Sequence, residues 1–290
     1  MNQRYFFYTV MVFQSILAAG TFLIVKIALR EIPPLDIALL RFSLASVVLL
    51  VLLQTTRKPI PVLPNDWKKI LWLAILAIPL NQTGFLVGMK FTTPSHAALL
   101  YATTPIFVLV LSARSAHEKI SLRKSIGIIL AFSGVLAVLL EKGLLFEIDF
   151  LMGDFLIWIA VLAWAGYTVY AKNLLPTYGA VALTTYALTL GTVLFLPIGL
   201  WSIRDLAWGS ISTSAWMSVL YLGLITSVVT YLIWYWALKR VVPSKVAIFS
   251  NLQPILTTGM AWLFLSEKIT LTFIVAGIVT LVGVIITQQG

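Results

Sequence analysis

The repeat that decides the fold reads TPSHAALLYATTPIFVLVLSARSAHEKI at residues 93–120 and VPSKVAIFSNLQPILTTGMAWLFLSEKI at residues 242–269. The matched pairs, each 149 positions apart, are Pro94 with Pro243, Pro105 with Pro254, Glu118-Lys119-Ile120 with Glu267-Lys268-Ile269, and Gly134 with Gly283. Nearer the start of the chain, Gly20 and Lys26 match Gly166 and Lys172 at an offset of 146. So many pairs at nearly one spacing indicate that the chain consists of two related halves.

Apolar segments surround this repeat along the whole chain. Of the 290 residues, 60% are hydrophobic and only 10% are charged, and the mean hydropathy is +1.01. Soluble domains are about 25% charged, and roughly 20 apolar residues cross a bilayer core as a helix. The sequence therefore predicts an all-α membrane protein of ten transmembrane helices, at roughly residues 5–29, 35–53, 69–90, 95–114, 122–141, 151–172, 179–201, 214–238, 243–264 and 270–288.

The loop charges predict how these helices cross the membrane. Loops on the side of the N-terminus hold thirteen Lys and Arg residues and the other loops hold six, which predicts that both termini are cytoplasmic. Because each half has five spans, the second half must cross in the opposite sense. Basic Arg114 and Arg123 accordingly match uncharged Leu263 and Thr272. We predict two inverted-topology five-helix repeats, residues 1–142 and 150–290, joined by a loop at 143–149, an arrangement typical of secondary transporters.

The ten spans, the two five-helix halves and the duplicated Pro-x10-Pro and Glu-Lys-Ile pattern resemble the drug/metabolite transporter superfamily, specifically its EamA-type permeases. The resemblance covers nearly the whole chain. It implies export or exchange of amino acids and related metabolites across the bacterial inner membrane. It also implies a central cavity lined by the first, third and fourth helices of each half, with the fifth helix as scaffold.

Two prolines, independently of the family resemblance, indicate a site near the middle of the membrane. Pro105 lies eleven residues after Pro94, about 16 Å along a helix and therefore about halfway across the bilayer, and Pro254 lies equally deep. Each removes one backbone hydrogen bond, which leaves the carbonyl of Tyr101 or Ser250 unpaired. Broken helices near the midplane are typical of transporter binding sites. The alternative is that both helix kinks only shape the bundle.

Uncharged polar and aromatic residues gather beside these kinks. Such groups often act only as hydrogen bonds between membrane helices, but here they converge on the six helices that the repeat nominates. A pocket of this kind would bind a small amphipathic or aromatic solute, including a zwitterion, partly by stacking and cation–π contact. The predicted substrate-binding residues are Gln14, Asn81, Gln82, Tyr101, Thr104, Trp164, Tyr167, Tyr231, Trp234, Ser250, Asn251 and Gln253.

The scarcity of reactive residues weighs against other functions. The chain has no cysteine and two histidines, so we expect no metal, no cofactor and no enzyme activity. The net charge of +10 includes no basic run longer than two residues, so we expect no nucleic-acid partner. The expected partners are a small-molecule substrate and the lipid bilayer.

Charged residues within the spans are few. We expect Asp36, Glu141 and Asp154 to stay wet at span ends. Gln14 lies roughly where related four-helix multidrug exporters carry a buried glutamate, which argues against that scheme of proton coupling. Arg41 is the only charge well inside a span, and a structural role, by snorkelling or by bonding carbonyls, is favoured over substrate contact.

The fifth and tenth spans carry small residues at the spacing of close helix contacts. They are Gly127, Ala131 and Gly134 in one span and Ala276, Thr280 and Gly283 in the other. We expect contacts within the bundle or between two copies, in a monomer or a homodimer. For the substrate, export of lipophilic drugs or lipid-linked molecules is the alternative to amino-acid-like metabolites.

Overall fold

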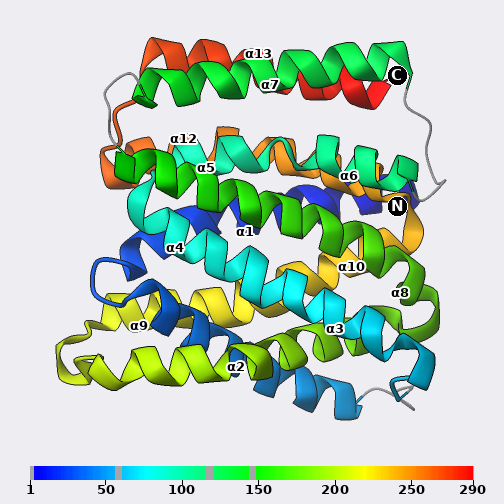
Figure 1. The fold of residues 1–290 in the computed structure, drawn as a ribbon, viewed down its shortest axis with the longest axis vertical. Helices are drawn as coiled ribbons and strands as arrows, with labels where there is room; N and C mark the ends of the chain where they lie inside the picture. The colour runs from blue at the N-terminus through cyan, green and yellow to red at the C-terminus, as the bar shows by residue number, and fades with distance from the viewer. Residues whose placement is uncertain (1–2, 56–60, 115–120, 144–147, 290) are drawn as a thin grey trace.

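The protein is a bundle of helices (Figure 1). The structure is a computed structural model that describes residues 3–55, 61–114, 121–143 and 148–289, and within these ranges it has no β-strand. Six helical runs in these ranges are long and apolar enough to cross a membrane, and Leu271–Thr287 is a shorter apolar helix. The prediction of an all-α membrane protein is confirmed. The count of ten spans and their inverted order remain predictions.

The helical elements follow one another with short connections. In chain order they are α1 Gln3–Ala28, α2 Pro34–Thr55, η1 Pro64–Asp66, α3 Trp67–Ile75, η2 Leu76–Gln82, α4 Thr83–Phe91, α5 Pro94–Tyr101, α6 Thr104–Arg114, α7 Leu122–Gly143, α8 Ile148–Ser202, η3 Ile203–Asp205, η4 Trp208–Ser210, α9 Thr213–Leu220, η5 Tyr221–Thr230, α10 Tyr231–Arg240, α11 Pro243–Ala247, η6 Ile248–Asn251, α12 Leu252–Leu265 and α13 Leu271–Gln289. The first Glu-Lys-Ile triplet, 118–120, and residues 144–147 of the predicted connecting loop lie outside the described residues.

Helix α8 changes direction at one glycine. Its 55 residues include Gly179, whose φ of 74° and ψ of 170° are not helical. A positive φ strains residues that carry a Cβ, so glycine suits this position. The segment after Gly179 runs back across the bundle in roughly the opposite direction (Figure 1). The predicted break between the sixth and seventh spans therefore falls at this residue.

Four of the predicted spans are not continuous α-helices. The third and eighth contain π-helical turns, η2 and η5, and Pro79 lies inside η2 without an N–H to donate. The fourth is divided where α5 ends at Tyr101 and α6 begins at Thr104, and the ninth is divided by the 3-10 turn η6 between α11 and α12. The interruptions in the fourth and ninth spans lie beside Pro105 and Pro254.

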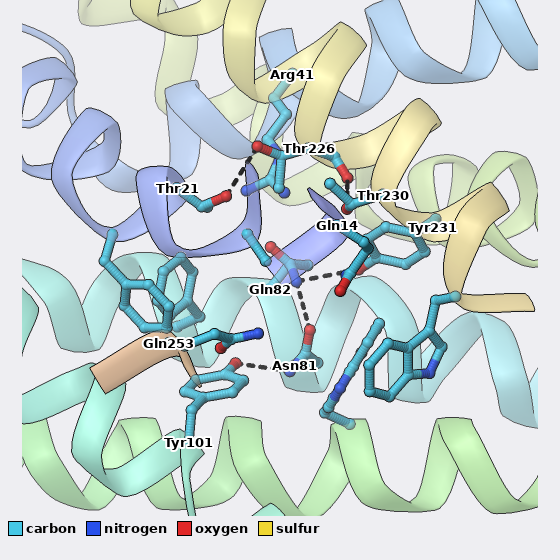
Figure 2. A pocket seen from close by; sticks show the side chains of 15 residues that line it. Gln14, Thr21, Arg41, Asn81, Gln82, Tyr101, Thr226, Thr230, Tyr231 and Gln253 are labelled. Carbon is cyan, nitrogen blue, oxygen red and sulfur yellow. Dashed lines mark hydrogen bonds between the residues drawn. The ribbon is translucent and has the colours of Figure 1, made fainter. Parts of the chain in front are cut away.

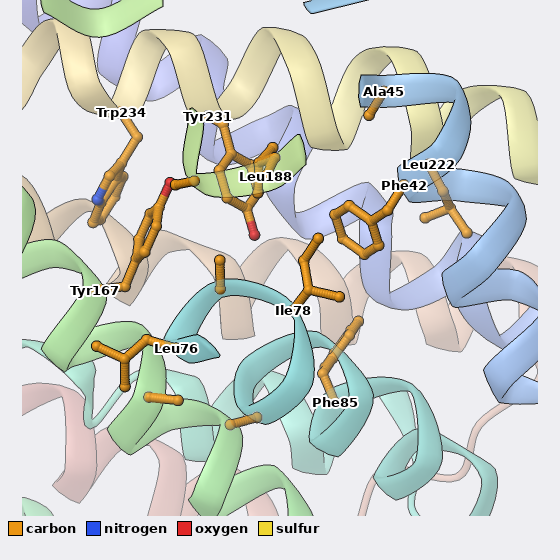
Figure 3. Packing of buried hydrophobic residues seen from close by; sticks show 14 of the residues in the cluster. Phe42, Ala45, Leu76, Ile78, Phe85, Tyr167, Leu188, Leu222, Tyr231 and Trp234 are labelled. Atoms are coloured by element: carbon orange, nitrogen blue, oxygen red, sulfur yellow. The ribbon is translucent and has the colours of Figure 1, made fainter. Parts of the chain in front are cut away.

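The apolar core lies where α2, α4, α8 and α10 meet the π-helical turns (Figure 3). Phe42 of α2, Ile78 of η2 and Phe85 of α4 approach one another there, with Leu222 of η5 beside them (Figure 3). Lipid tails are as apolar as these side chains, so close van der Waals packing stabilises the association rather than removal from water. The close fit of these side chains therefore stabilises the centre of the bundle.

Two lysines make the same contact in the two halves. Lys26 Nζ donates to the carbonyls of Met89 (2.9 Å) and Thr92 (2.7 Å), at the end of α4. Lys172 Nζ donates to the carbonyls of Leu238 and Val241, at the end of α10. Each ammonium thus satisfies the last carbonyls of a helix and meets the negative end of its dipole. The repeat pair Lys26 and Lys172 is equivalent in structure as well as in sequence.

A carboxylate outside the candidate spans joins the α1–α2 loop to the start of α9. The Glu31 carboxylate accepts hydrogen bonds from the Ser212 amide (2.6 Å) and the Ser212 hydroxyl (2.7 Å). These bonds hold the pKa of Glu31 below its ordinary value. Ser212 also caps α9, since its hydroxyl accepts from the amide of Ala215. One residue therefore fixes both the loop and the helix end.

Helices α7 and α13 lie side by side at one edge of the bundle (Figure 1). A methyl group on Gly283 would lie 2.7 Å from the Gly127 carbonyl oxygen and would also meet the amide nitrogen of Ala131. A methyl group on Gly134 would lie 2.5 Å from the Ala276 carbonyl oxygen. The predicted contact between small residues is therefore confirmed within the bundle. A contact between two copies remains a prediction.

We predict that Gly283→Ala destabilises the protein, whereas Gly277→Ala on the same helix does not. The added methyl at position 283 overlaps backbone atoms of α7 that cannot move aside, and overpacking of this kind costs about 1–3 kcal/mol. At position 277 nothing lies within 4 Å of the new methyl. Melting temperatures of the purified variants in detergent measure the difference. Equal melting temperatures would contradict the close packing of α7 on α13.

Candidate functional site

A cavity lies at the centre of the bundle (Figure 2). Its volume is about 70 Å³, which holds roughly two water molecules. The side chains around it come from α1, α2, η2, α4, α5, α8, η5, α10 and α12. The fifteen lining residues are Gln14, Ala18, Thr21, Phe22, Arg41, Asn81, Gln82, Phe85, Tyr101, Trp164, Thr226, Thr230, Tyr231, Trp234 and Gln253.

Most of the predicted site residues lie around this one cavity. Eight of the twelve line it, namely Gln14, Asn81, Gln82, Tyr101, Trp164, Tyr231, Trp234 and Gln253. Thr104, Tyr167, Ser250 and Asn251 are buried but are not among its lining residues. Tyr167 supports the wall from behind, since its ring stacks on Trp164 with centroids 5.4 Å apart. Substrate binding by any of them remains a prediction.

A chain of hydrogen bonds crosses the cavity and joins the two halves (Figure 2). Asn81 Nδ2 donates to the hydroxyl of Tyr101 (2.9 Å) and to the carbonyl of Ala160 (2.7 Å). Gln82 Nε2 donates to Asn81 Oδ1 and to the Tyr231 hydroxyl (3.1 Å). Hydrogen bonds between buried polar side chains commonly link the helices of membrane proteins. These four side chains therefore fix η2 against α5, α8 and α10.

Aromatic clusters flank this chain on two sides. Phe22, Phe85 and Tyr101 meet edge to face, with ring centroids 5.4–5.7 Å apart. Trp164 packs against Tyr231 at 5.2 Å and Trp234 at 5.4 Å, and these distances favour attractive ring geometries. The cavity is thus a polar strip between aromatic walls.

Several lining residues were missing from the predicted set. They are Ala18, Thr21, Phe22, Arg41, Phe85, Thr226 and Thr230. The Thr21 and Thr226 hydroxyls are hydrogen-bonded at 2.9 Å, which joins α1 to η5. The repeat offset would have found Thr230, because it lies 149 positions after Asn81. No repeat position points to Thr226, whose partner by the same offset is Ala77.

Arg41 lies inside the bundle rather than at its surface. It is 1% exposed, and its Nε donates to the Ser227 hydroxyl at 2.7 Å. Its Nη1 is buried and has no hydrogen-bond partner. The expectation that it snorkels or bonds carbonyls is therefore not met. Because Arg41 lines the cavity, α2, the second helix of the first half, contributes to the lining in addition to the six helices that the family resemblance implies.

Three polar atoms of the lining are buried without a partner. They are Gln14 Oε1, Gln82 Oε1 and Arg41 Nη1. Buried polar groups in proteins are nearly always hydrogen-bonded, so each exception calls for an explanation. The three atoms come from α1, η2 and α2 and share one cavity. A bound solute or water is the simplest source of the missing partners.

The expectation that Asp36 and Asp154 stay wet is wrong. Asp154 is 2% exposed and Asp36 is 1% exposed. Asp154 accepts a hydrogen bond from Thr92 Oγ1 (2.7 Å) and pairs with His96 Nδ1 at 3.3 Å. The physical reason is close helix contact: a methyl on Gly153 would lie 3.0 Å from the Gly88 carbonyl, so α8 packs tightly on α4 and covers the carboxylate.

Metal chemistry has no evident site in the described part of the chain. No group of three or more His, Cys, Asp or Glu side chains in that part is placed to hold a metal ion. His96 pairs with Asp154, and its ring stacks on Phe273 and meets Phe150 edge to face. The cavity itself contains amides, hydroxyls, aromatic rings and one guanidinium.

The EamA-like transporter family matches the chain twice, over residues 6–140 and over residues 151–288. The chain belongs to this family. Two matches that together cover most of the chain support the two-repeat architecture. This EamA-like transporter is therefore a multi-pass membrane protein of a transporter family.

Relatives of this EamA-like transporter carry the same description. A protein of Archaeoglobus fulgidus named an uncharacterized transporter is 31% identical over 273 residues, which cover 93% of this chain and 92% of that protein. The uncharacterized transporter YetK of Bacillus subtilis is 30% identical over 264 residues, or 89% of this chain and 79% of YetK. A solved crystal structure has the same fold, with a TM-score of 0.67 at 16% identity, covering 96% of this chain and 95% of that one.

We predict that Asn81→Ala destabilises the protein more than Gln14→Ala. Asn81 takes part in three hydrogen bonds, each worth about 0.6 kcal/mol between membrane helices, so their loss should cost about 2 kcal/mol. Gln14 Oε1 has no partner to lose. Thermal unfolding in detergent compares the two amide deletions in one cavity. A larger loss for Gln14→Ala would show that the network does not hold η2 in place.

Proposed function

We propose that this EamA-like transporter moves small amphipathic or aromatic metabolites, resembling amino acids, by alternating access around the central cavity. The expected location is the bacterial inner membrane, with both termini in the cytoplasm, and the expected direction is export. The observation that carries the proposal is the set of unpaired buried atoms on Gln14, Gln82 and Arg41, which face one aromatic-walled cavity between the two repeats. Ligand sites in proteins commonly combine apolar walls with a few such polar groups.

The small volume of the cavity implies movement. About 70 Å³ is too little for an amino acid with an aromatic side chain, since it holds roughly two waters. The bonded side chains Asn81, Gln82, Tyr101 and Tyr231 occupy the space around it. An aromatic amino acid would therefore separate these groups when it enters.

The non-α backbone supplies places where the helices can change shape. The π-helical turns η2 and η5 and the 3-10 turn η6 all lie next to lining residues. π-Helical turns occur frequently at functional sites. The equivalent lysine contacts at the ends of α4 and α10 support two halves that move as related units. Rocking of one half against the other would open the cavity to each side in turn.

Flux into proteoliposomes tests this function. The full chain would be reconstituted and given labelled amino acids and one aromatic cation, with and without a pH gradient. We expect at least one amino acid to move, and Trp164→Ala/Gln253→Ala to reduce its rate at least tenfold, because both side chains line the cavity. Trp262→Ala is the matched control, because Trp262 lies on α12 like Gln253 but is 60% exposed.

The possible outcomes separate the proposals. Flux that the cavity variant abolishes and the control retains supports a transporter with its site between the halves. Flux without a gradient identifies a facilitator, and dependence on the gradient identifies proton coupling. If no amino acid moves, the amino-acid proposal fails, and lipophilic or lipid-linked solutes become the substrates to test.

A further inference from the structure

Arg41 is the one charged side chain among the described residues that line the cavity. We propose that Arg41 receives the carboxylate of the transported solute, so that the cavity selects small organic acids, amino acids included, over their amides. This inference rests on the proposed transport function and names the solute group that the site recognises.

The contacts of Arg41 leave part of its guanidinium unused. Nε donates to Ser227 Oγ at 2.7 Å, and the guanidinium carbon lies 4.8 Å from the centre of the Phe42 ring. Nη1 has no partner although the residue is only 1% exposed. Figure 2 shows the side chain pointing from α2 past Thr21 and Thr226 into the pocket. The guanidinium is therefore anchored at one edge, with unused donors beside the cavity.

No carboxylate in the lining balances this charge. None of the described residues around the cavity is acidic. The acid nearest along α2, Asp36, lies five residues earlier, about 7.5 Å along the helix axis, and neither of its carboxylate oxygens has a hydrogen-bond partner. An uncompensated buried charge is costly within a membrane and usually marks a functional site. The planar fork of an arginine matches the two oxygens of a carboxylate.

The repeat argues that the scaffold does not need this charge. The residues 146 and 149 positions after Arg41 are Ala187 and Leu190, which are both apolar. The lysines that cap α4 and α10, in contrast, occur in both halves. The second half therefore builds its equivalent region without a cation. A role confined to one half is what recognition of an asymmetric solute requires.

The remaining unpaired atoms suit the other end of such a solute. Gln14 Oε1 and Gln82 Oε1 are acceptors, so they can bind an ammonium or a hydroxyl group. The indole face of Trp164 adds an attractive surface for a cation. An amino acid would thus find a cation for its carboxylate and neutral acceptors for its ammonium. This arrangement recognises a zwitterion without an acidic residue.

Binding to the purified full chain in detergent tests the inference without relying on transport. The probes are L-alanine, L-phenylalanine and benzoate, and each acid is compared with its carboxamide. The measured quantity is the probe concentration needed for half of the maximal rise in melting temperature. We expect at least one acid to stabilise the protein, with its amide at least tenfold weaker. Arg41→Gln should weaken binding of that acid at least tenfold. Arg240→Gln is the control, because Arg240 is exposed, donates to the Trp236 carbonyl and is not among the residues that line the cavity.

Two further variants keep the test valid if Arg41→Gln does not fold. Arg41→Lys keeps the charge but loses the planar fork, and Ser227→Ala removes the anchor of Nε, so both should bind the acid several-fold more weakly. The inference is overturned if each acid and its amide bind equally, if these variants bind like the wild type, or if no acid stabilises the protein. Acid binding that depends on Arg41, in a protein that moves no solute, would overturn transport while supporting this site.

Discussion

A polar atom inside a membrane-embedded bundle has no water to bond, so it must find a partner within the protein. This constraint organises the molecule. Asn81 meets it with Tyr101 and Ala160, Lys26 and Lys172 meet it at the ends of two helices, and Thr21 meets it with Thr226. Where the lining does not meet it, the unpaired atoms of Gln14, Gln82 and Arg41 gather at one cavity. The proposed transport function gives these three atoms a partner from outside the protein.

Duplication supplies the frame in which that cavity is built. The same lysine contact closes α4 and α10, and the small residues of α7 and α13 form one continuous contact at the edge of the bundle. The breaks are duplicated as well, with the π-helical turns η2 and η5 in one pair of spans and the interruptions near Pro105 and Pro254 in another. Rigid scaffold and deformable site are therefore built from different helices of each half.

Sequence patterns predicted the features that depend on local or repeated chemistry. Hydropathy, the offset of 149 and residue size were enough to predict four features. These are the apolar spans, the two halves, the glycine contacts of α7 and α13, and eight lining residues. The burial of Asp154 could not be predicted, because it depends on how closely α8 approaches α4 at Gly88 and Gly153. The position of Arg41 in the cavity lining could not be predicted either, because the depth of a residue along a helix does not reveal which face of the helix meets the cavity.

The hydrogen bonds within the cavity have a role in the proposed transport cycle. Asn81 and Gln82 bond to Tyr101 and Tyr231, so few of the lining atoms remain unsatisfied. A solute that enters replaces these bonds with its own, and such an exchange yields only a small net free energy. A transporter needs this balance, since a solute held too tightly would not leave. Arg41 is the charged group among the described lining residues and its Nη1 has no internal partner, so in the proposed site it is the group that favours one class of solute over another.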